Sequence, residues 1–176
     1  MRKKQIDPAL FVRNRERLRQ ILPKGAMAVV HANDIMPTNA DGVLPFQQNR
    51  NLYHLTGVDQ EETVLIFFPD APEERDREYL FVRKTSELLT IWEGEKLTKE
   101  AAQNISGIDR VEWTESFEGI FHRLAPQAES LYLDSNEHIR ANTIVETRNA
   151  RFIKDCQERY PLHQYGRLAQ LMNQLR

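Results

Sequence analysis

Six side chains are the ones most able to bind a metal ion or attack a substrate, and they are scattered along the chain. They are His31, His54, His122, His138, His163 and the only cysteine, Cys156. No two of the histidines have the i, i+4 spacing with which two imidazoles on one helix face bind zinc. Cys156 has no glycine-rich or histidine-bearing neighbourhood, so we interpret it as a buried, unreactive thiol. These residues predict neither metal nor thiol chemistry.

Carboxylates and short catalytic motifs give no stronger signal. Asp34 and Asp41 lie in one polar segment, where we expect solvent-exposed turns, because a two-metal site needs several acids on rigid elements. The chain has no phosphate-binding glycine loop and no Gly-x-Ser-x-Gly motif. The apolar stretch 26–31 carries no acid, which counts against a nuclease of the ribonuclease H type. We therefore expect no catalytic residue and no metal ligand in this chain.

Length and charge narrow the class of protein further. The 176 residues carry a net charge of −2, and an electrostatic footprint for nucleic acid would need a basic excess. Arginines at 13, 15, 17 and 19 are spread around a helix, and we interpret them as a solvated face. No apolar run approaches a membrane span of about 18 residues, and the start of the chain does not resemble a signal peptide. We expect a cytoplasmic protein that binds neither nucleic acid nor membrane.

Helices and strands alternate along the chain. Asp7-Pro8 begins a helix with a stripe of Leu10, Phe11, Leu18, Ile21 and Leu22, and Pro23-Lys24-Gly25 ends it. Strands are expected at 27–30, 63–68, 79–82, 111–113 and 131–133. The segment 32–45 is a long loop and 73–78 a solvated turn. Such alternation predicts one helix-covered mixed sheet over residues 1–176, without an interior boundary.

The remaining helices are predicted from caps and apolar spacing. Thr98 begins a helix that Gly107 ends, and Thr114 or Ser116 begins one that Pro126 ends. From about Asn136 the chain is expected to be helical towards Cys156. A final amphipathic helix carries Leu168, Leu171, Met172 and Leu175.

Two segments are distinctive once the ordinary elements are assigned. The first, 45–57, is predicted to be a short helical turn ended by Gly57, with Phe46, Leu52 and Leu55 packed inward. The second, 87–94, places Trp92 between an isoleucine and a glutamate before Gly94. Because an exposed tryptophan is costly, Trp92 is either local core or an interface anchor.

These two segments, in this order, resemble the amino-terminal domain of aminopeptidase P, a branch of the creatinase and prolidase metallopeptidases. The opening pattern of Phe11, Arg15 and Leu18 and the strand 63–68 also match. The resemblance implies an α/β fold, a three-layer α/β/α domain with a mixed sheet and ribonuclease-H-like topology. A separate pita-bread catalytic domain follows it in the family, and we expect that domain to be absent from this chain.

The resemblance also implies a function. The parent enzyme would remove the residue that precedes proline at a peptide's amino terminus, using two manganese ions in the catalytic domain. This chain would be inactive alone, contact its own catalytic domain and contribute to a homo-oligomer. Trp92 would control substrate access at a subunit interface, and the other motif residues would be mainly structural: Phe46, Gln48, Asn49, Leu52, Leu55, Gly57 and Gly94.

Departures and alternatives stay open. The family commonly has arginine where Gln47 stands and tyrosine where His54 stands, so any charged contact of that arginine is in doubt. The chain could instead be a non-catalytic interaction module derived from the family. It could also be the corresponding domain of a prolidase or creatinase, although the segment Ile91-Trp92-Glu93-Gly94 favours aminopeptidase P.

Overall fold

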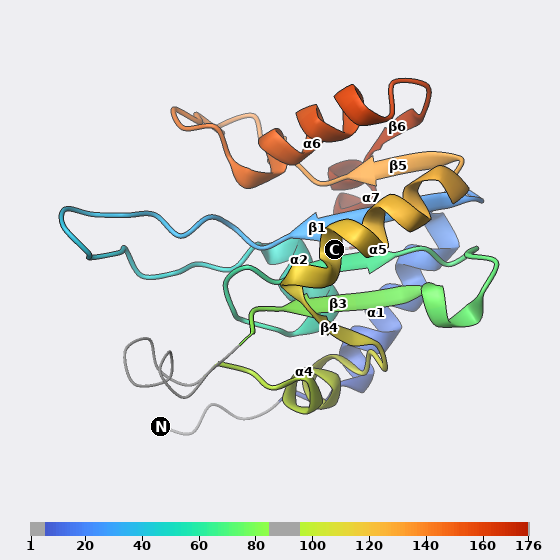
Figure 1. The fold of residues 1–176 in the computed structure, drawn as a ribbon, viewed down its shortest axis with the longest axis horizontal. Coiled ribbons are helices and arrows are strands. Elements are labelled where there is room, and N and C mark those ends of the chain that lie inside the picture. Colours follow the sequence, from blue (N-terminus) through green and yellow to red (C-terminus); the bar gives the residue numbers. More distant parts are fainter. Residues whose placement is uncertain (1–5, 85–95, 176) are drawn as a thin grey trace.

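A mixed β-sheet forms the centre of the computed structural model, which describes residues 6–84 and 96–175. Within these ranges the strand order is β4-β3-β2-β1-β5-β6. The strands are β1 (Ala26–His31), β2 (Val64–Phe67), β3 (Glu78–Val82), β4 (Val111–Trp113), β5 (Ser130–Leu133) and β6 (Gln164–Arg167). Only β2 among them runs antiparallel to its neighbours. The carboxyl ends of the other strands therefore meet at one edge, the carboxyl edge of the sheet (Figure 1).

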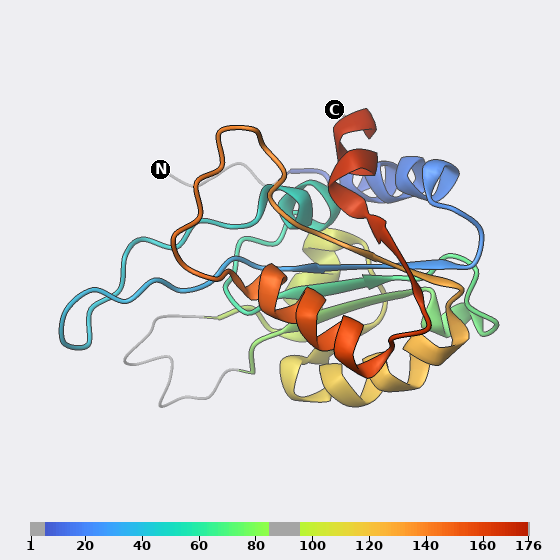
Figure 2. The ribbon, with the colours of Figure 1, turned by 90° about the horizontal axis from the view of Figure 1, so that it is seen from above.

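Helices cover both faces of this sheet, as Figure 2 shows with the sheet seen edge-on. One face packs against α1 (Ala9–Ile21), α2 (Arg50–Thr56), α4 (Lys99–Ser106) and α7 (Leu168–Leu175). The other packs against α5 (Phe117–Leu124) and α6 (Arg148–Arg159). Alternate residues of β1 enter the two cores, Ala28 and Val30 one and Met27 and Val29 the other. The predicted three-layer α/β/α arrangement with a mixed sheet is confirmed.

Several predicted helix ends are confirmed by their caps. The Asp7 carboxylate accepts a hydrogen bond from the Ala9 N–H at 2.9 Å, and the Thr98 hydroxyl accepts one from the Ala101 N–H at 3.1 Å. Gly107 ends α4 with φ of 68°, a left-handed conformation that glycine adopts without steric cost. Local chemistry therefore determines these boundaries.

Other boundaries differ from the prediction. The helix expected from Asn136 begins only at Arg148, where the Thr147 hydroxyl accepts from the Ala150 N–H at 3.3 Å. The preceding segment has no apolar face that packs against the sheet, since Ile139 and Ile144 are more than 90% exposed. Within the described ranges, neither Thr114 nor Ser116 caps α5 through its side chain, because a 3-10 turn, η2 (Thr114–Ser116), leads into the helix.

Strand β6 was not predicted, because its four residues lack an apolar alternation. It pairs parallel to β5, with Gly166 opposite Tyr132. A Cβ at Gly166 would lie 2.2 Å from the Tyr132 ring, so only glycine allows the two strands to approach. The strand thus depends on a close contact with β5, which the sequence of the strand itself does not indicate.

The expectation that the arginines of the first helix form a solvated face is wrong for Arg15. Arg15 is 2% exposed and its guanidinium donates to the carbonyls of Leu55 (2.8 Å) and Ser106 (2.9 Å). It also donates to Glu78 at 3.1 Å. One buried cation therefore joins the carboxyl ends of α2 and α4 to β3. Leu10 of the predicted stripe is in turn 38% exposed.

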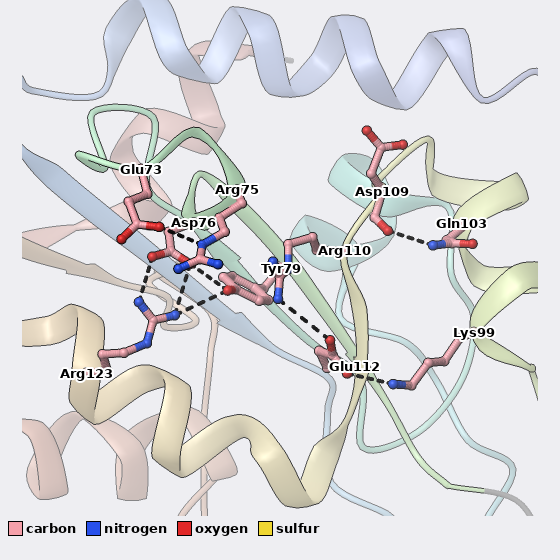
Figure 3. Close-up of polar contacts among 10 residues, drawn as sticks. All are labelled: Glu73, Arg75, Asp76, Tyr79, Lys99, Gln103, Asp109, Arg110, Glu112 and Arg123. Carbon is pink, nitrogen blue, oxygen red and sulfur yellow. Dashed lines mark hydrogen bonds and ion pairs between the residues drawn. The ribbon is translucent and has the colours of Figure 1, made fainter.

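A charged cluster fastens the connection between β2 and β3 to α5 (Figure 3). The Asp76 carboxylate accepts two hydrogen bonds from the Arg123 guanidinium, at 2.6 and 2.9 Å, and one from the Tyr79 hydroxyl at 2.6 Å. The Arg110 guanidinium lies 5.0 Å from the centroid of the Tyr79 ring. The segment 73–78 is therefore a solvated turn only at its start, because Asp76 is buried.

Candidate functional site

The distinctive segment 45–57 lies at the carboxyl edge, where the chain returns after β1. The Gln48 side-chain amide donates to the carbonyls of Val58 (3.1 Å) and Gln60 (2.8 Å). Its amide oxygen accepts from the Asn49 N–H at 2.8 Å. Gln48 thus links the residues before α2 to those after it, and it holds Asn49, the residue that precedes α2, in place.

Helix α2 is capped at both ends by residues of this segment. The Asn49 side-chain oxygen accepts from the N–H groups of Asn51 and Leu52, at 2.8 and 3.3 Å. Gly57 ends the helix with φ of 69°, and a Cβ there would lie 2.2 Å from the Phe11 ring. Leu52 and Leu55 are fully buried and Phe46 packs half-buried on the same core.

A buried aspartate gathers the asparagines of this segment. The Asp134 carboxylate accepts from the side-chain amides of Asn49 (2.8 Å) and Asn51 (2.6 Å). Asp134 is 4% exposed and follows β5 directly, so its position at the carboxyl edge is fixed by the sheet. Sequence reasoning missed this residue, although an aspartate directly after an apolar strand was a usable signal.

A polar cleft of about 710 Å³ opens beside these residues, and we call it the carboxyl-edge cleft. One wall comes from Asn33 and the segment 47–51, and the other from residues 134–138 with Thr143, Thr147 and Asn149. Asn173 of α7 also lines it. The cleft therefore collects residues that are distant in the sequence into one surface feature.

Two carboxylates near the cleft are paired with arginines. Glu137 forms a two-point ion pair with Arg167, whose hydrogen bonds hold the pKa of that carboxyl below its usual range. Asp34 accepts from the Arg148 N–H at 2.7 Å and pairs with Arg151 at 2.5 Å. Asp34 is thus engaged with the start of α6 instead of forming a solvent-exposed turn, whereas Asp41 is exposed.

Two buried groups on the face of the sheet that α5 and α6 cover have shifted pKa values. His31 is 3% exposed between the rings of Phe117 and Phe152, with centroids at 5.3 and 4.4 Å. In the described part of the chain neither of its ring nitrogens has a hydrogen-bond partner. Burial, together with the charge of Arg148, lowers the pKa of His31 well below its ordinary value.

Cys156 is fully buried, and burial raises the pKa of its thiol to about 12. Reactive cysteines have depressed pKa values, so Cys156 is a core residue.

Some sequence-derived candidates find no place in this geometry. Trp92 and Gly94 lie outside the described residues. Across residues 6–84 and 96–175, no group of three or more His, Cys, Asp or Glu side chains is arranged to bind a metal ion. Within the same ranges, no helix is both long and apolar enough to span a bilayer.

Comparison with known proteins identifies the family to which this fold belongs. The family described as "Aminopeptidase P, N-terminal domain" matches residues 11–132, which include β1 to β4 and most of β5. The chain belongs to this family. Its relationship to aminopeptidase P, inferred above from the segments 45–57 and 87–94, is thereby confirmed.

Individual relatives agree with the family. Xaa-Pro aminopeptidase of Escherichia coli is 26% identical over 143 residues, which are 81% of this chain and 32% of that enzyme. A Bacillus anthracis structure, described as that of an aminopeptidase P, is 28% identical with a TM-score of 0.86 and covers 97% of this chain. This chain covers 40% of that one.

A zinc-substituted form of E. coli aminopeptidase P in complex with product has the same fold, with a TM-score of 0.67 at 24% identity. The match covers 93% of this chain and 37% of the E. coli one. The chain therefore spans about a third to two fifths of the length of these relatives.

Proposed function

We propose that this chain is the amino-terminal accessory domain of an Xaa-Pro aminopeptidase, an enzyme that removes the residue before proline from the amino terminus of a peptide. One observation supports this above the others. Nearly the whole chain, 97% of it, superposes on the Bacillus anthracis aminopeptidase P at a TM-score of 0.86, yet it accounts for only 40% of that protein.

The proposal divides the work between two parts of one polypeptide. In this proposal the chain itself binds no metal ion and carries out no catalytic step. The two manganese ions and the hydrolysis belong to the catalytic domain. The present domain shapes the route of the substrate and contributes oligomer contacts, with Trp92 at a subunit interface, in a cytoplasmic enzyme.

Hydrolysis of a peptide with proline at its second position tests this division. Two polypeptides are compared in the presence of manganese: the 176 residues, and a longer one that continues through the catalytic domain of the same gene. We expect cleavage only by the longer polypeptide. Cleavage by the 176 residues would overturn the accessory role. A gene without such a continuation would favour the alternative of an interaction module.

The role of Trp92 is tested in the longer polypeptide. Trp92→Ala should lower kcat/KM for short peptides, while Trp92→Phe, which keeps an aromatic ring, should retain most of it. Size-exclusion chromatography of both variants separates a lost oligomer from a lost substrate contact. Equal activity of wild type and Trp92→Ala would remove Trp92 from the proposal.

A further inference from the structure

The carboxyl-edge cleft lies where the connections of two neighbouring parallel strands diverge. β1 and β5 are adjacent and parallel. The chain after β1 leads to α2 on one face of the sheet, and the chain after β5 leads to α6 on the other. Such a divergence leaves a crevice outside the carboxyl ends of the strands, and open α/β sheets commonly bind ligands there. The cleft between residues 47–51 and 134–138 is that crevice.

The chemistry of the cleft is that of neutral hydrogen bonding. Of the described residues that line it, half are asparagine or glutamine and Ala169 alone is apolar. A side-chain amide can both donate and accept. Gln48 and Asn49 use most of this capacity within the protein, so a ligand would bind mainly to the other amides of the lining. An apolar ligand would need a mostly apolar lining. The charged residues among the described lining residues are Arg50, Asp134 and Glu137. Glu137 is paired with Arg167, and Arg50 and Asp134 carry opposite charges, so this lining has no excess of one sign that would favour a strongly charged ligand.

The amides of one wall are held in place from beneath. The buried Asp134 accepts from Asn49 and Asn51, so these amide groups cannot rotate freely. Asn149 also approaches this carboxylate, with its amide nitrogen 3.5 Å from the Asp134 oxygen that accepts from Asn49. A preorganised set of donors and acceptors loses less entropy when a ligand binds.

We propose that the carboxyl-edge cleft binds a short peptide through its main chain. A peptide presents one N–H donor and one C=O acceptor per residue, which is the pattern that side-chain amides complement. The volume of about 710 Å³ falls within the usual range of small-ligand sites. The choice of a peptide over another neutral polar ligand, such as an oligosaccharide, rests on the proposed function.

A titration of the 176-residue chain followed by ¹H–¹⁵N correlation spectra tests the site. The probes are N-acetyl-trialanine amide, which has no charge and small side chains, and maltotriose as a neutral oligosaccharide. We expect the trialanine probe to cause saturable shifts at Asn49, Asn51 and Asn149, with a Kd on the order of 1 mM. Maltotriose should cause none.

Two neighbouring residues of α7 give a matched pair of variants. Asn173 lines the cleft and Gln174 does not, and both are exposed. Asn173→Ala and Asn149→Ala should each weaken binding of the trialanine probe at least threefold, and Gln174→Ala should leave it unchanged. Unaltered spectra away from the cleft establish that the variants fold.

Three results would overturn the proposal: no saturation by the trialanine probe, wild-type affinity of both Asn149→Ala and Asn173→Ala for that probe, or binding of maltotriose without binding of the trialanine probe. The titration contains no hydrolysis step, so it fails or succeeds independently of the proposed function. Cleavage by the longer polypeptide without binding in this cleft would refute the peptide site and leave the accessory role standing.

Discussion

Two aspartates at opposite ends of the sheet are buried to the same degree and held by different chemistry. Asp76 is 3% exposed and Asp134 is 4% exposed. Asp76 accepts from the Arg123 guanidinium and the Tyr79 hydroxyl, whereas Asp134 accepts from the neutral amides of Asn49 and Asn51.

The difference separates a structural contact from a surface prepared for a ligand. A carboxylate with a two-point guanidinium partner has its charge satisfied, and its role is to join elements. The neutral amides around the Asp134 carboxylate line the carboxyl-edge cleft, and a side-chain amide can both donate and accept hydrogen bonds. The amino-terminal end of the sheet is therefore held by an ion pair, and the carboxyl edge carries the cleft that we propose as a binding site.

The largest expected effect on stability is at the amino-terminal end of the sheet, where Asp76 lies. Asp76→Ala leaves Arg123 and Tyr79 without their shared acceptor and should lower the free energy of unfolding by about 3 kcal/mol. Urea denaturation at pH 7 measures it. Glu74→Ala is the control, because Glu74 is exposed in its pair with Arg77 and should cost less than about 0.5 kcal/mol. Equal losses would contradict the structural role of Asp76.

The second largest effect is a loss of stability in acid, which has its cause in the same aspartate. Hydrogen bonds from Arg123 lower the pKa of Asp76 from 3.8 to about 2. Its contribution is therefore complete above pH 4 and is lost as pH falls from 4 to 2, a change of about 2 kcal/mol. Stability curves between pH 5 and 2 should show this loss in wild type and a smaller one in Asp76→Asn. Parallel curves would contradict the ion-pair account.

A smaller loss is expected at the carboxyl edge. Asp134→Asn places a donor against the amides of Asn49 or Asn51 and should cost about 1.5 kcal/mol at pH 7. Ser135→Ala, next to it, should cost much less. Urea denaturation measures both. If Asp134→Asn lowers the free energy of unfolding more than Asp76→Ala does, Asp134 contributes more to stability than Asp76 and the comparison is reversed.

The smallest effect concerns His31 near neutral pH. Its pKa is lowered in the folded state, so below pH 6.5 the unfolded chain gains a proton that the folded chain does not. Stability is complete above pH 6.5 and should fall by about 1 kcal/mol between pH 6.5 and 5.5. His31→Phe should remove that fall, and His138→Gln, at an exposed position, should retain it. Thermal unfolding at pH 6.5 and at pH 5.5 measures the change in stability of each variant.

Much of the architecture could be predicted because its causes are local. Gly57 and Gly107 end helices where the left-handed conformation is required, and Thr98 caps the helix that follows it. The apolar strand 63–68 contains β2 at the middle of the sheet. Each of these signals lies within a few residues of the structure it determines.

The errors about charged side chains concern residues whose partners lie far along the chain. Arg15 bonds to Glu78 and Ser106, and Asp76 bonds to Arg123. A charged residue looks solvated until such a partner is known. Of the candidate site, the turn 45–57 could be predicted, but the convergence of Asn49 with Asp134 could not, because it depends on the pairing of β1 with β5.

That pairing also dictates an order of events during synthesis. Ala26 of β1 lies opposite Ser130 of β5, so β1 and β2 are made well before the strand that covers the other side of β1. At ordinary elongation rates, on the order of 10 s separates them. Throughout that interval the nascent chain carries an apolar strand with one edge open, and open strand edges promote aggregation.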